Sequence, residues 1–275
     1  MHKADLHVHT IMSDGNNTIE ELIPMCIKRG IDTLAITDHD TVGAFKDFKN
    51  NNKINIIKGI ELSTDYKGKS VHILGYFIDE NNKNLLSKLK YLREKRESRA
   101  HTIAEKLREN FNISIDFNNL KTLSSDNSIG RMHIAKELVN KGYVPNTSKA
   151  FEKYIGDDCP CFVKNEKLYV DEAVKLIKDA GGISFLAHPG LIKGTDNYDE
   201  ILDMGLQGIE VFYPKHSNEQ RQYFYDLAIK RGILISGGSD FHGLKTKGKN
   251  KLGSAYLTQK YLDKIIDFHK NMTKS

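Results

Sequence analysis

The stretch 3-KADLHVHTIMSDG-15 combines a short strand-like run with side chains of the kind that bind metals. Successive side chains of a strand point to opposite faces, so Asp5, His7 and His9 share one face while two aliphatic residues share the other. Burying such polar groups without partners costs roughly 2–7 kcal/mol each. The pattern therefore leaves three interpretations: a metal site, a hydrogen-bonded network in the core, or an exposed edge.

Six further runs of strand length follow along the chain and alternate with helical patterns. Several are rich in Ile, Val and Leu without strict alternation, as expected where helices cover both faces of a sheet. The alternation favours a parallel sheet, either open or closed into a barrel. The seven strands are expected at residues 3–9, 32–38, 54–62, 71–77, 183–188, 208–213 and 233–240.

Helical patterns occupy most of the intervening segments. Thr18 and Glu21 have the spacing of a capping box, which predicts a helix that ends near Gly30. Pro24 fits poorly inside that helix, so a later start or a kink is also consistent with the sequence. Further helices are expected at about 41–50, 171–180, 198–204 and 217–231.

The region 82–165 has a different character. The run 84–111 is long, highly charged and periodic, with Leu85, Leu89 and Leu92 on one helical stripe. Two more helices are expected at 131–142 and 146–156. We therefore expect a helical insert between the fourth and fifth strands.

Composition limits the classes of function. A chain of 275 residues fits one large α/β domain or a domain with an insert. The net charge of +5 is modest and scattered, which argues against a general nucleic-acid or membrane surface but suits a small anionic substrate or a short polynucleotide. Three cysteines without zinc-finger spacing favour a reducing cytoplasm. We expect neither a signal peptide nor a membrane span.

Histidines and carboxylates recur where the expected strands end. Parallel open sheets and barrels both place functional groups at the carboxyl ends of their strands. His72 is the exception because it opens its strand, a difficulty that an antiparallel fourth strand would remove. Any one of these histidines is more often a hydrogen-bonded core residue than a ligand, and Glu210 alone is also consistent with a structural ion pair with a nearby Lys.

Taken together, the imidazoles and carboxylates at the strand ends match the ligands that divalent metals require. Their number exceeds the three or four ligands of a mononuclear site. It predicts two or three metals with a bridging carboxylate, an arrangement used to hydrolyse phosphate esters. The candidate metal ligands are His7, His9, Asp14, His39, Glu61, His72, His188, Asp240 and His242.

Six short motifs resemble those of the PHP (polymerase and histidinol phosphatase) superfamily, in the family's order and over nearly the whole chain. The resemblance implies a distorted (β/α)7 barrel with a trinuclear site of Mn, Fe, Zn or Mg at the carboxyl ends of its strands. It also implies that residues 1–81 and 166–275 form the barrel and that 82–165 form a small helical insert over the active site. The motifs are 5-DLHVHT-10, 13-SDG-15, 37-TDHD-40, 59-GIE-61, 187-AHP-189 and 239-SDFHG-243.

The same resemblance implies three ligand sets. Glu61 would bridge two of the metals, and Asp5 and Asp38 would orient histidines through their second ring nitrogens. The family often has His where Asp14 stands, and an Asp there resembles its nucleotide-phosphoesterase branch. The implied sets are His7, His9, Glu61 and Asp240 for one metal, Glu61, His72 and His188 for a second, and Asp14, His39 and His242 for the third.

The insert strengthens the likeness to that branch. The runs 130-GRMHIAKEL-138 and 160-PCFVKNEK-167 resemble the insert of family members that act on nucleoside 3′,5′-bisphosphates or on the 5′ ends of short RNAs. By that resemblance, the catalytic and substrate-binding residues would include Arg131 and His133, which contact substrate phosphate; the alternative for Arg131 is a surface charge at a helix N-terminus. Lys164 and His216 are weaker candidates for the same pocket.

The sequence thus predicts a metal-dependent phosphoesterase that hydrolyses phosphate monoesters of small nucleotides with a metal-bridged hydroxide. Two or three divalent ions would lower the pKa of the attacking water from about 15.7 to about 7. The alternatives are a histidinol-phosphate phosphatase, a 5′–3′ exoribonuclease acting on short RNA, and a non-catalytic metal-binding accessory module. The expected partner is a small phosphorylated substrate, a nucleotide or short RNA, with no membrane contact and no stable binding of duplex DNA.

Overall fold

A computed structural model describes residues 2–49, 53–122, 129–194, 197–243 and 250–274, which separate into two compact units. Unit 1 comprises Met1–Leu86 and Leu168–Ser275, and unit 2 comprises Ser87–Lys167. Within the described ranges, every helix is too short or too polar to cross a membrane.

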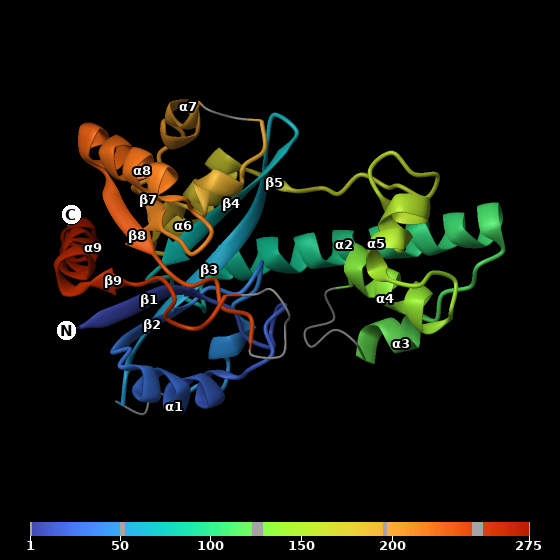
Figure 1. Ribbon diagram of the computed structural model, residues 1–275, viewed down its shortest axis with the longest axis horizontal. Coiled ribbons are helices and arrows are strands. Elements are labelled where there is room, and N and C mark those ends of the chain that lie inside the picture. The colour runs from blue at the N-terminus through green and yellow to red at the C-terminus, as the bar shows by residue number, and fades with distance from the viewer. Residues whose placement is uncertain (1, 50–52, 123–128, 195–196, 244–249, 275) are drawn as a thin grey trace. The chain divides into compact units, whose positions relative to one another are not determined.

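Unit 1 is built on one strongly curved sheet (Figure 1). Its strands follow the order β8-β7-β6-β4-β3-β2-β1-β9, and β5 pairs with β3 off this path. Beyond β8, Phe241 forms a parallel bridge with Val8 of β1, so the sheet nearly closes into the distorted barrel that the sequence predicted. The strands are β1 (Lys3–Val8), β2 (Thr33–Ile36), β3 (Asn55–Tyr66), β4 (Lys69–Tyr76), β5 (Leu168–Tyr169), β6 (Ile183–Leu186), β7 (Gly208–Phe212), β8 (Leu234–Gly237) and β9 (Leu257–Thr258).

The fourth strand distorts the barrel because it is antiparallel to both of its neighbours, β3 and β6. Its register places His72 opposite Ser63, two residues after Glu61. An antiparallel strand begins at the edge where its parallel neighbours end, so a histidine in the first half of β4 lies near the carboxyl edge of the sheet. The fourth strand is thus antiparallel, which removes the difficulty that the sequence raised for His72.

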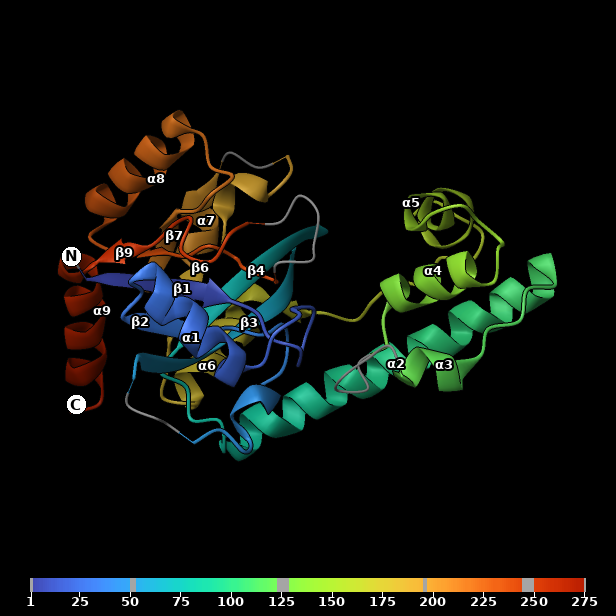
Figure 2. The same cartoon turned by 60° about the horizontal axis from the view of Figure 1, so that its bottom comes forward.

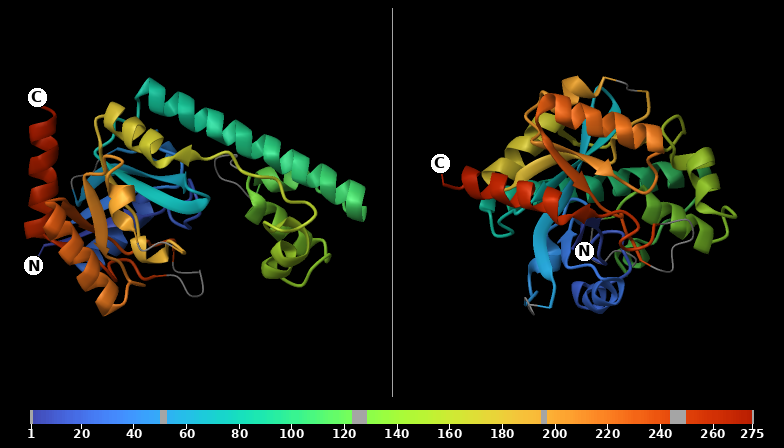
Figure 3. Two further views of the ribbon diagram at one scale, coloured as in Figure 1. Left: turned by 90° about the horizontal axis from the view of Figure 1, so that it is seen from above. Right: turned by 60° about the vertical axis from the view of Figure 1, so that its left-hand side comes forward.

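Helices cover the outside of this sheet, with α6 on β6, α8 on β7 and α9 on β8 (Figures 2 and 3). The capping box of α1 is confirmed, since Glu21 N donates to Thr18 Oγ1 and Thr18 N donates to Glu21 Oε2, and Pro24 lies inside the helix without ending it. The helices are α1 (Ile19–Arg29), α6 (Val170–Asp179), α7 (Tyr198–Leu202), α8 (Asn218–Arg231) and α9 (Gln259–Met272), with one-turn segments η1 (Gly43–Phe45) and η3 (Pro189–Leu191).

In unit 1 one predicted helix is wrong and one observed helix was not predicted. The helix expected over 41–50 is wrong, because the described part of this segment holds only the one-turn η1. There Thr41 Oγ1 accepts a hydrogen bond from Gly43 N at 3.1 Å, a local side-chain contact that competes with helical pairing. The long helix α9 was not predicted, although Leu262 and Ile265 are buried at helical spacing.

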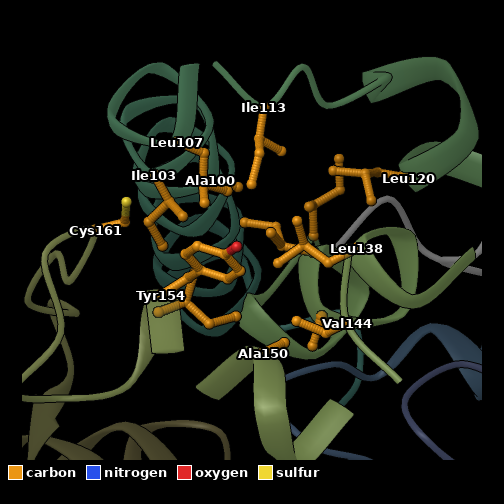
Figure 4. Close-up of a cluster of buried hydrophobic side chains, with 14 residues drawn as sticks. Ala100, Ile103, Leu107, Ile113, Leu120, Leu138, Val144, Ala150, Tyr154 and Cys161 are labelled. Carbon is orange, nitrogen blue, oxygen red and sulfur yellow. The ribbon is translucent and has the colours of Figure 1, made fainter. Parts of the chain in front are cut away.

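Unit 2 is helical and has a hydrophobic core of its own (Figure 4). Apolar side chains of α2, including Ile103 and Leu107, meet Leu138 of α4 and Tyr154 of η2 in this core. The short α3 was not among the predicted helices. The elements are α2 (Lys83–Phe111), which begins in unit 1, α3 (Phe117–Thr122), α4 (Arg131–Asn140), α5 (Thr147–Ala150) and the π-helical η2 (Phe151–Ile155).

Candidate metal centre

The structure brings all nine predicted ligand residues together at the carboxyl edge of the unit 1 sheet. They fall into four overlapping groups, and within each group the candidate ligand atoms lie within 4.8 Å of one another. Four of the nine belong to more than one group, as expected if neighbouring cations share ligands. The groups are His9, Asp14, His39 and His242; His7, Glu61 and His188; His7, His9 and Asp240; and His39, Glu61 and His72.

Glu61 of β3 lies at the middle of these groups and is fully buried. Its two carboxylate oxygens face different histidines, which is the arrangement of a bridging ligand. Oε1 lies 2.8 Å from His72 Nδ1 and 3.0 Å from His188 Nε2. Oε2 lies 3.1 Å from His7 Nε2, 3.2 Å from His9 Nε2 and 3.3 Å from His39 Nδ1.

Two aspartates extend the cluster on the side of His9. Asp240 Oδ1 lies 3.2 Å from His9 Nε2 and 3.5 Å from His242 Nδ1. Asp14 Oδ1 lies 3.1 Å from His242 Nε2 and 3.8 Å from His9 Nδ1. Tyr213 Oη donates to Asp240 Oδ2 at 2.9 Å and so fixes the orientation of that carboxylate.

Burial and charge leave this cluster in need of positive charge. Burial alone would raise the pKa of Glu61, but the neighbouring His39, His7 and His72 hold it well below its usual value. Burial would lower the pKa of His9, but the Asp240 and Glu61 carboxylates raise it to about 10. Without cations the centre therefore binds protons in their place.

The donor chemistry of the cluster fits divalent cations. His9 Nδ1, His9 Nε2 and His39 Nδ1 are buried without hydrogen-bond partners, although carboxylate oxygens lie 3.2–3.8 Å away. Buried polar atoms of this kind are rare in folded proteins unless an ion or water satisfies them. More than one metal ion, bound by these imidazole nitrogens and by carboxylate oxygens around a shared Glu61, would satisfy them.

Backbone strain accompanies the site. His188 and Asp240 have φ angles of 26° and 52°, values that residues other than glycine rarely adopt. Such conformations cost on the order of 1–3 kcal/mol each and persist where the surrounding structure imposes them. At these two strand ends, the strained backbone holds His188 against Glu61 and Asp240 against His9.

The carboxylates around the candidate ligands differ from the expectation. Asp5 accepts hydrogen bonds from the backbone N–H groups of Ser239 and Gly253, while Asp38 accepts bonds from Thr10 and Ser13. Both therefore fix loops, and the expectation that they orient histidines through a second ring nitrogen is wrong.

Glu210 of β7 takes that role instead. Its Oε1 lies 3.0 Å from His7 Nδ1, and its Oε2 accepts a hydrogen bond from His188 N at 2.7 Å. The ion pair with a lysine that the sequence allowed for Glu210 is therefore replaced by these contacts. A carboxylate inside a buried apolar strand was the sequence signal for this role.

We expect Glu210→Gln to weaken metal binding by about 10- to 100-fold, because His7 loses the carboxylate that fixes its ring and raises its basicity. Calorimetric titration of the metal-free protein with Mn²⁺, after removal of metal by a chelator, measures the effect. Gln222→Glu is the control. It makes the reverse substitution at an exposed position of α8 and should leave the Mn²⁺ affinity unchanged. Equal affinities for wild type and Glu210→Gln would contradict the prediction.

Metal binding is expected to release protons. His9 has its pKa raised to about 10 in the absence of cations, so it carries a proton near neutral pH that a bound cation must displace. The apparent Mn²⁺ affinity should therefore rise with pH from about 6 to about 9. Calorimetry in two buffers of different ionisation enthalpy measures the protons released, and a heat independent of the buffer would contradict the prediction.

The predicted substrate-contacting residues lie in different surroundings. Arg131 is the first residue of α4, and His133 Nδ1 accepts a hydrogen bond from Gly130 N at 3.1 Å. Lys164 is exposed in unit 2. His216 is buried in unit 1, and both of its ring nitrogens are hydrogen-bonded to the main chain, at Val211 O and Gly190 N, so neither nitrogen is open to a substrate.

Comparisons with known proteins agree with this geometry. A family model described as PHP domain matches residues 5–203. A 5′-3′ exoribonuclease of Haemophilus influenzae is 34% identical over 90% of this chain and 94% of its own. A 3′,5′-nucleoside bisphosphate phosphatase of Chromobacterium violaceum is 33% identical over 91% of this chain and 90% of its own. A solved structure from Bifidobacterium adolescentis superposes with a TM-score of 0.80 at 27% identity, over 96% of this chain and 95% of that one.

Proposed function

Since the chain belongs to the PHP domain family and is a metal-dependent phosphoesterase of that family, we propose that it hydrolyses phosphate monoesters of small nucleotides. Nucleoside 3′,5′-bisphosphates are the proposed substrate class. The observation that carries the proposal is Glu61, whose two oxygens each face their own set of histidines. Carboxylate-bridged cations are a device for displacement at phosphorus.

We propose the nine clustered residues as the metal ligands. Their nitrogen and oxygen donors suit Mn, Fe, Zn or Mg. When bound, divalent cations would polarise the phosphoryl oxygens and acidify the attacking water. Glu61 holds the two sets of histidines in register, and Glu210 fixes the ring of His7. The pKa of Tyr213 is raised by burial and by Asp240, so its hydroxyl stays protonated and continues to donate to Asp240.

Residues of unit 2 are proposed to bind the phosphate of the substrate. Arg131 supplies a planar guanidinium that suits two phosphate oxygens, and His133 and Lys164 add donors. Arg131 and His133 are also the residues we propose to assist catalysis, by neutralising negative charge that grows on the phosphoryl oxygens during the reaction.

A second candidate is a 5′-3′ exoribonuclease acting on short RNA. The similarity to the Haemophilus influenzae exoribonuclease supports it as strongly as the phosphatase similarity supports the first candidate. Both activities use the same displacement at phosphorus, so they differ in the group that leaves and not in the metal centre.

Phosphate release from a small panel tests the proposal. With Mn²⁺ present, adenosine 3′,5′-bisphosphate should be hydrolysed with a higher kcat/KM than histidinol phosphate. A 5′-phosphorylated RNA oligonucleotide in the same panel reports exonuclease activity by the appearance of shortened products. Preference for the oligonucleotide would favour the second candidate. Absence of hydrolysis of every phosphate ester by metal-loaded protein would refute both and favour an accessory module.

A further inference from the structure

In unit 2, three cationic side chains are held by backbone carbonyls of one loop, residues 155–163. The loop is fixed at both ends, because the side chains of Tyr154 and Cys161 lie in the hydrophobic core and Cys161 N donates to Tyr154 O at 3.0 Å (Figure 4). The loop therefore sets the positions of the three cations. The pairs are Arg99 Nε with Val163 O at 2.7 Å, Arg131 Nη1 with Ile155 O at 3.2 Å, and Lys106 Nζ with Phe162 O at 3.1 Å.

Arg131 faces a carboxylate and two aromatic rings. Its Nη1 donates to Asp157 Oδ1 at 2.6 Å. The guanidinium carbon lies 5.5 Å from the ring centroid of Phe151 and 5.8 Å from that of Phe162. The side chain of Arg131 is 26% exposed, whereas that of Asp157 is 76% exposed. An embedded guanidinium is thus paired with a carboxylate that extends from the surface.

Arg99 places a second guanidinium on the same loop, because its Nε donates to Val163 O while Arg131 donates to Ile155 O. Burial and the charges of Arg131 and Arg96 lower its pKa to about 10, and Asp157 offsets part of that effect. Among the described residues, Arg99 forms its hydrogen bond through Nε, which leaves the Nη groups available to a ligand. Like charges held together at partial burial are unfavourable unless an anion joins them.

We propose that Arg99 and Arg131 form a two-guanidinium site for a phosphoryl group, and that Asp157 occupies this site while no phosphate is bound. The choice of ligand rests on the proposed function. Arg131 alone is implied by the family resemblance, whereas Arg99 as a second donor and Asp157 as an internal competitor follow from the contacts of loop 155–163.

Phosphate suits the site better than a carboxylate does. A phosphate monoester carries about −1.5 to −2 charges near neutral pH and three acceptor oxygens, so it can bond two guanidiniums together. The Asp157 carboxylate carries one charge and bonds Arg131. The Asp157 carboxylate is largely exposed and water screens its pairing with Arg131, so a bound phosphate displaces the carboxylate at low cost.

Direct binding to the full-length, EDTA-treated protein tests the site without the metal centre. The probe is adenosine 3′,5′-bisphosphate, and adenosine serves as the probe without phosphate. Arg99→Gln should weaken binding of the bisphosphate by about 10- to 100-fold, because it removes charge-assisted hydrogen bonds. Arg99→Lys should recover part of the affinity, since it keeps the charge and loses the planar fork.

Asp157→Asn should have the opposite effect and tighten binding by about 2- to 5-fold, because the internal competitor is gone. This exposed residue also keeps the proposal testable if a variant of Arg99 fails to fold, which a thermal melt detects. Arg93→Gln is the matched control, an exposed arginine of the same helix, and should bind the probe as wild type does.

The inference would be overturned by no saturable binding of the bisphosphate by the wild type, by equal affinity for adenosine, by wild-type affinity in Arg99→Gln, or by weaker binding in Asp157→Asn. Loss of binding in Arg93→Gln as large as in Arg99→Gln would also overturn it. The proposed function is judged separately, by phosphate release from metal-loaded protein. Either can therefore fail while the other stands.

Discussion

Replacing Glu61 with Gln is expected to lower kcat/KM for the proposed nucleotide substrate by at least about 10³-fold, equivalent to about 4 kcal/mol of transition-state stabilisation. Glu61 is the residue whose two oxygens lie within 3.3 Å of five histidine nitrogens, so the amide removes a charge that both sets of ligands share. An amide nitrogen also places a donor where a cation needs an acceptor.

Metal content distinguishes this cause from a general loss of structure. Glu61→Gln should bind fewer Mn²⁺ ions per chain than wild type after identical loading and desalting, as measured by elemental analysis. Glu20→Gln, the same change on the exposed first turn of α1, should keep both metal content and activity. A variant of Glu61 with full metal content and activity would show that this carboxylate does not bridge.

The positions of the candidate ligands followed from the sequence because all but His72 lie within a local motif. His7 and His9 alternate on one strand, and 239-SDFHG-243 follows another, so local spacing placed them at strand ends. Motif order then identified the family. The partners that lie far away in sequence could not be found in this way. His7 and Glu210 are separated by 203 positions, and only the order of β1, β8 and β7 brings them together.

The fold was predictable to a similar extent. Long apolar runs fixed seven strands, and the position of His72 alone indicated that the fourth runs antiparallel. The two-residue strands β5 and β9 depend on tertiary pairing and carry too little pattern to predict. In the described part of 41–50 the expected helix is replaced by the one-turn η1, at whose start Gly43 N donates to Thr41 Oγ1 and not to the main chain of a preceding turn.

Removing the metals is expected to abolish activity and to lower the melting temperature. Chelation should reduce phosphate release by at least about 10⁴-fold, because lowering the pKa of the attacking water by several units is what the cations supply. Stability should fall as well, since a cation at 1,000 times its dissociation constant contributes about 4 kcal/mol to the folded state. For a domain of this size that corresponds to a drop of roughly 8–16 °C.

The drop in melting temperature should itself depend on pH, because protons compete for the same buried groups. Carboxylates around the histidines raise the pKa of His9 to about 10, above its unfolded value of 6.5. The protonated ring of His9 therefore stabilises the metal-free protein fully below about pH 6.5, and that contribution is lost as the pH rises toward 10. The melting temperature gained on adding Mn²⁺ should accordingly be larger at about pH 9 than at about pH 6. In Glu61→Gln, where the shared carboxylate is absent, the gain should be small at both values, and an undiminished gain there would contradict the central role of Glu61.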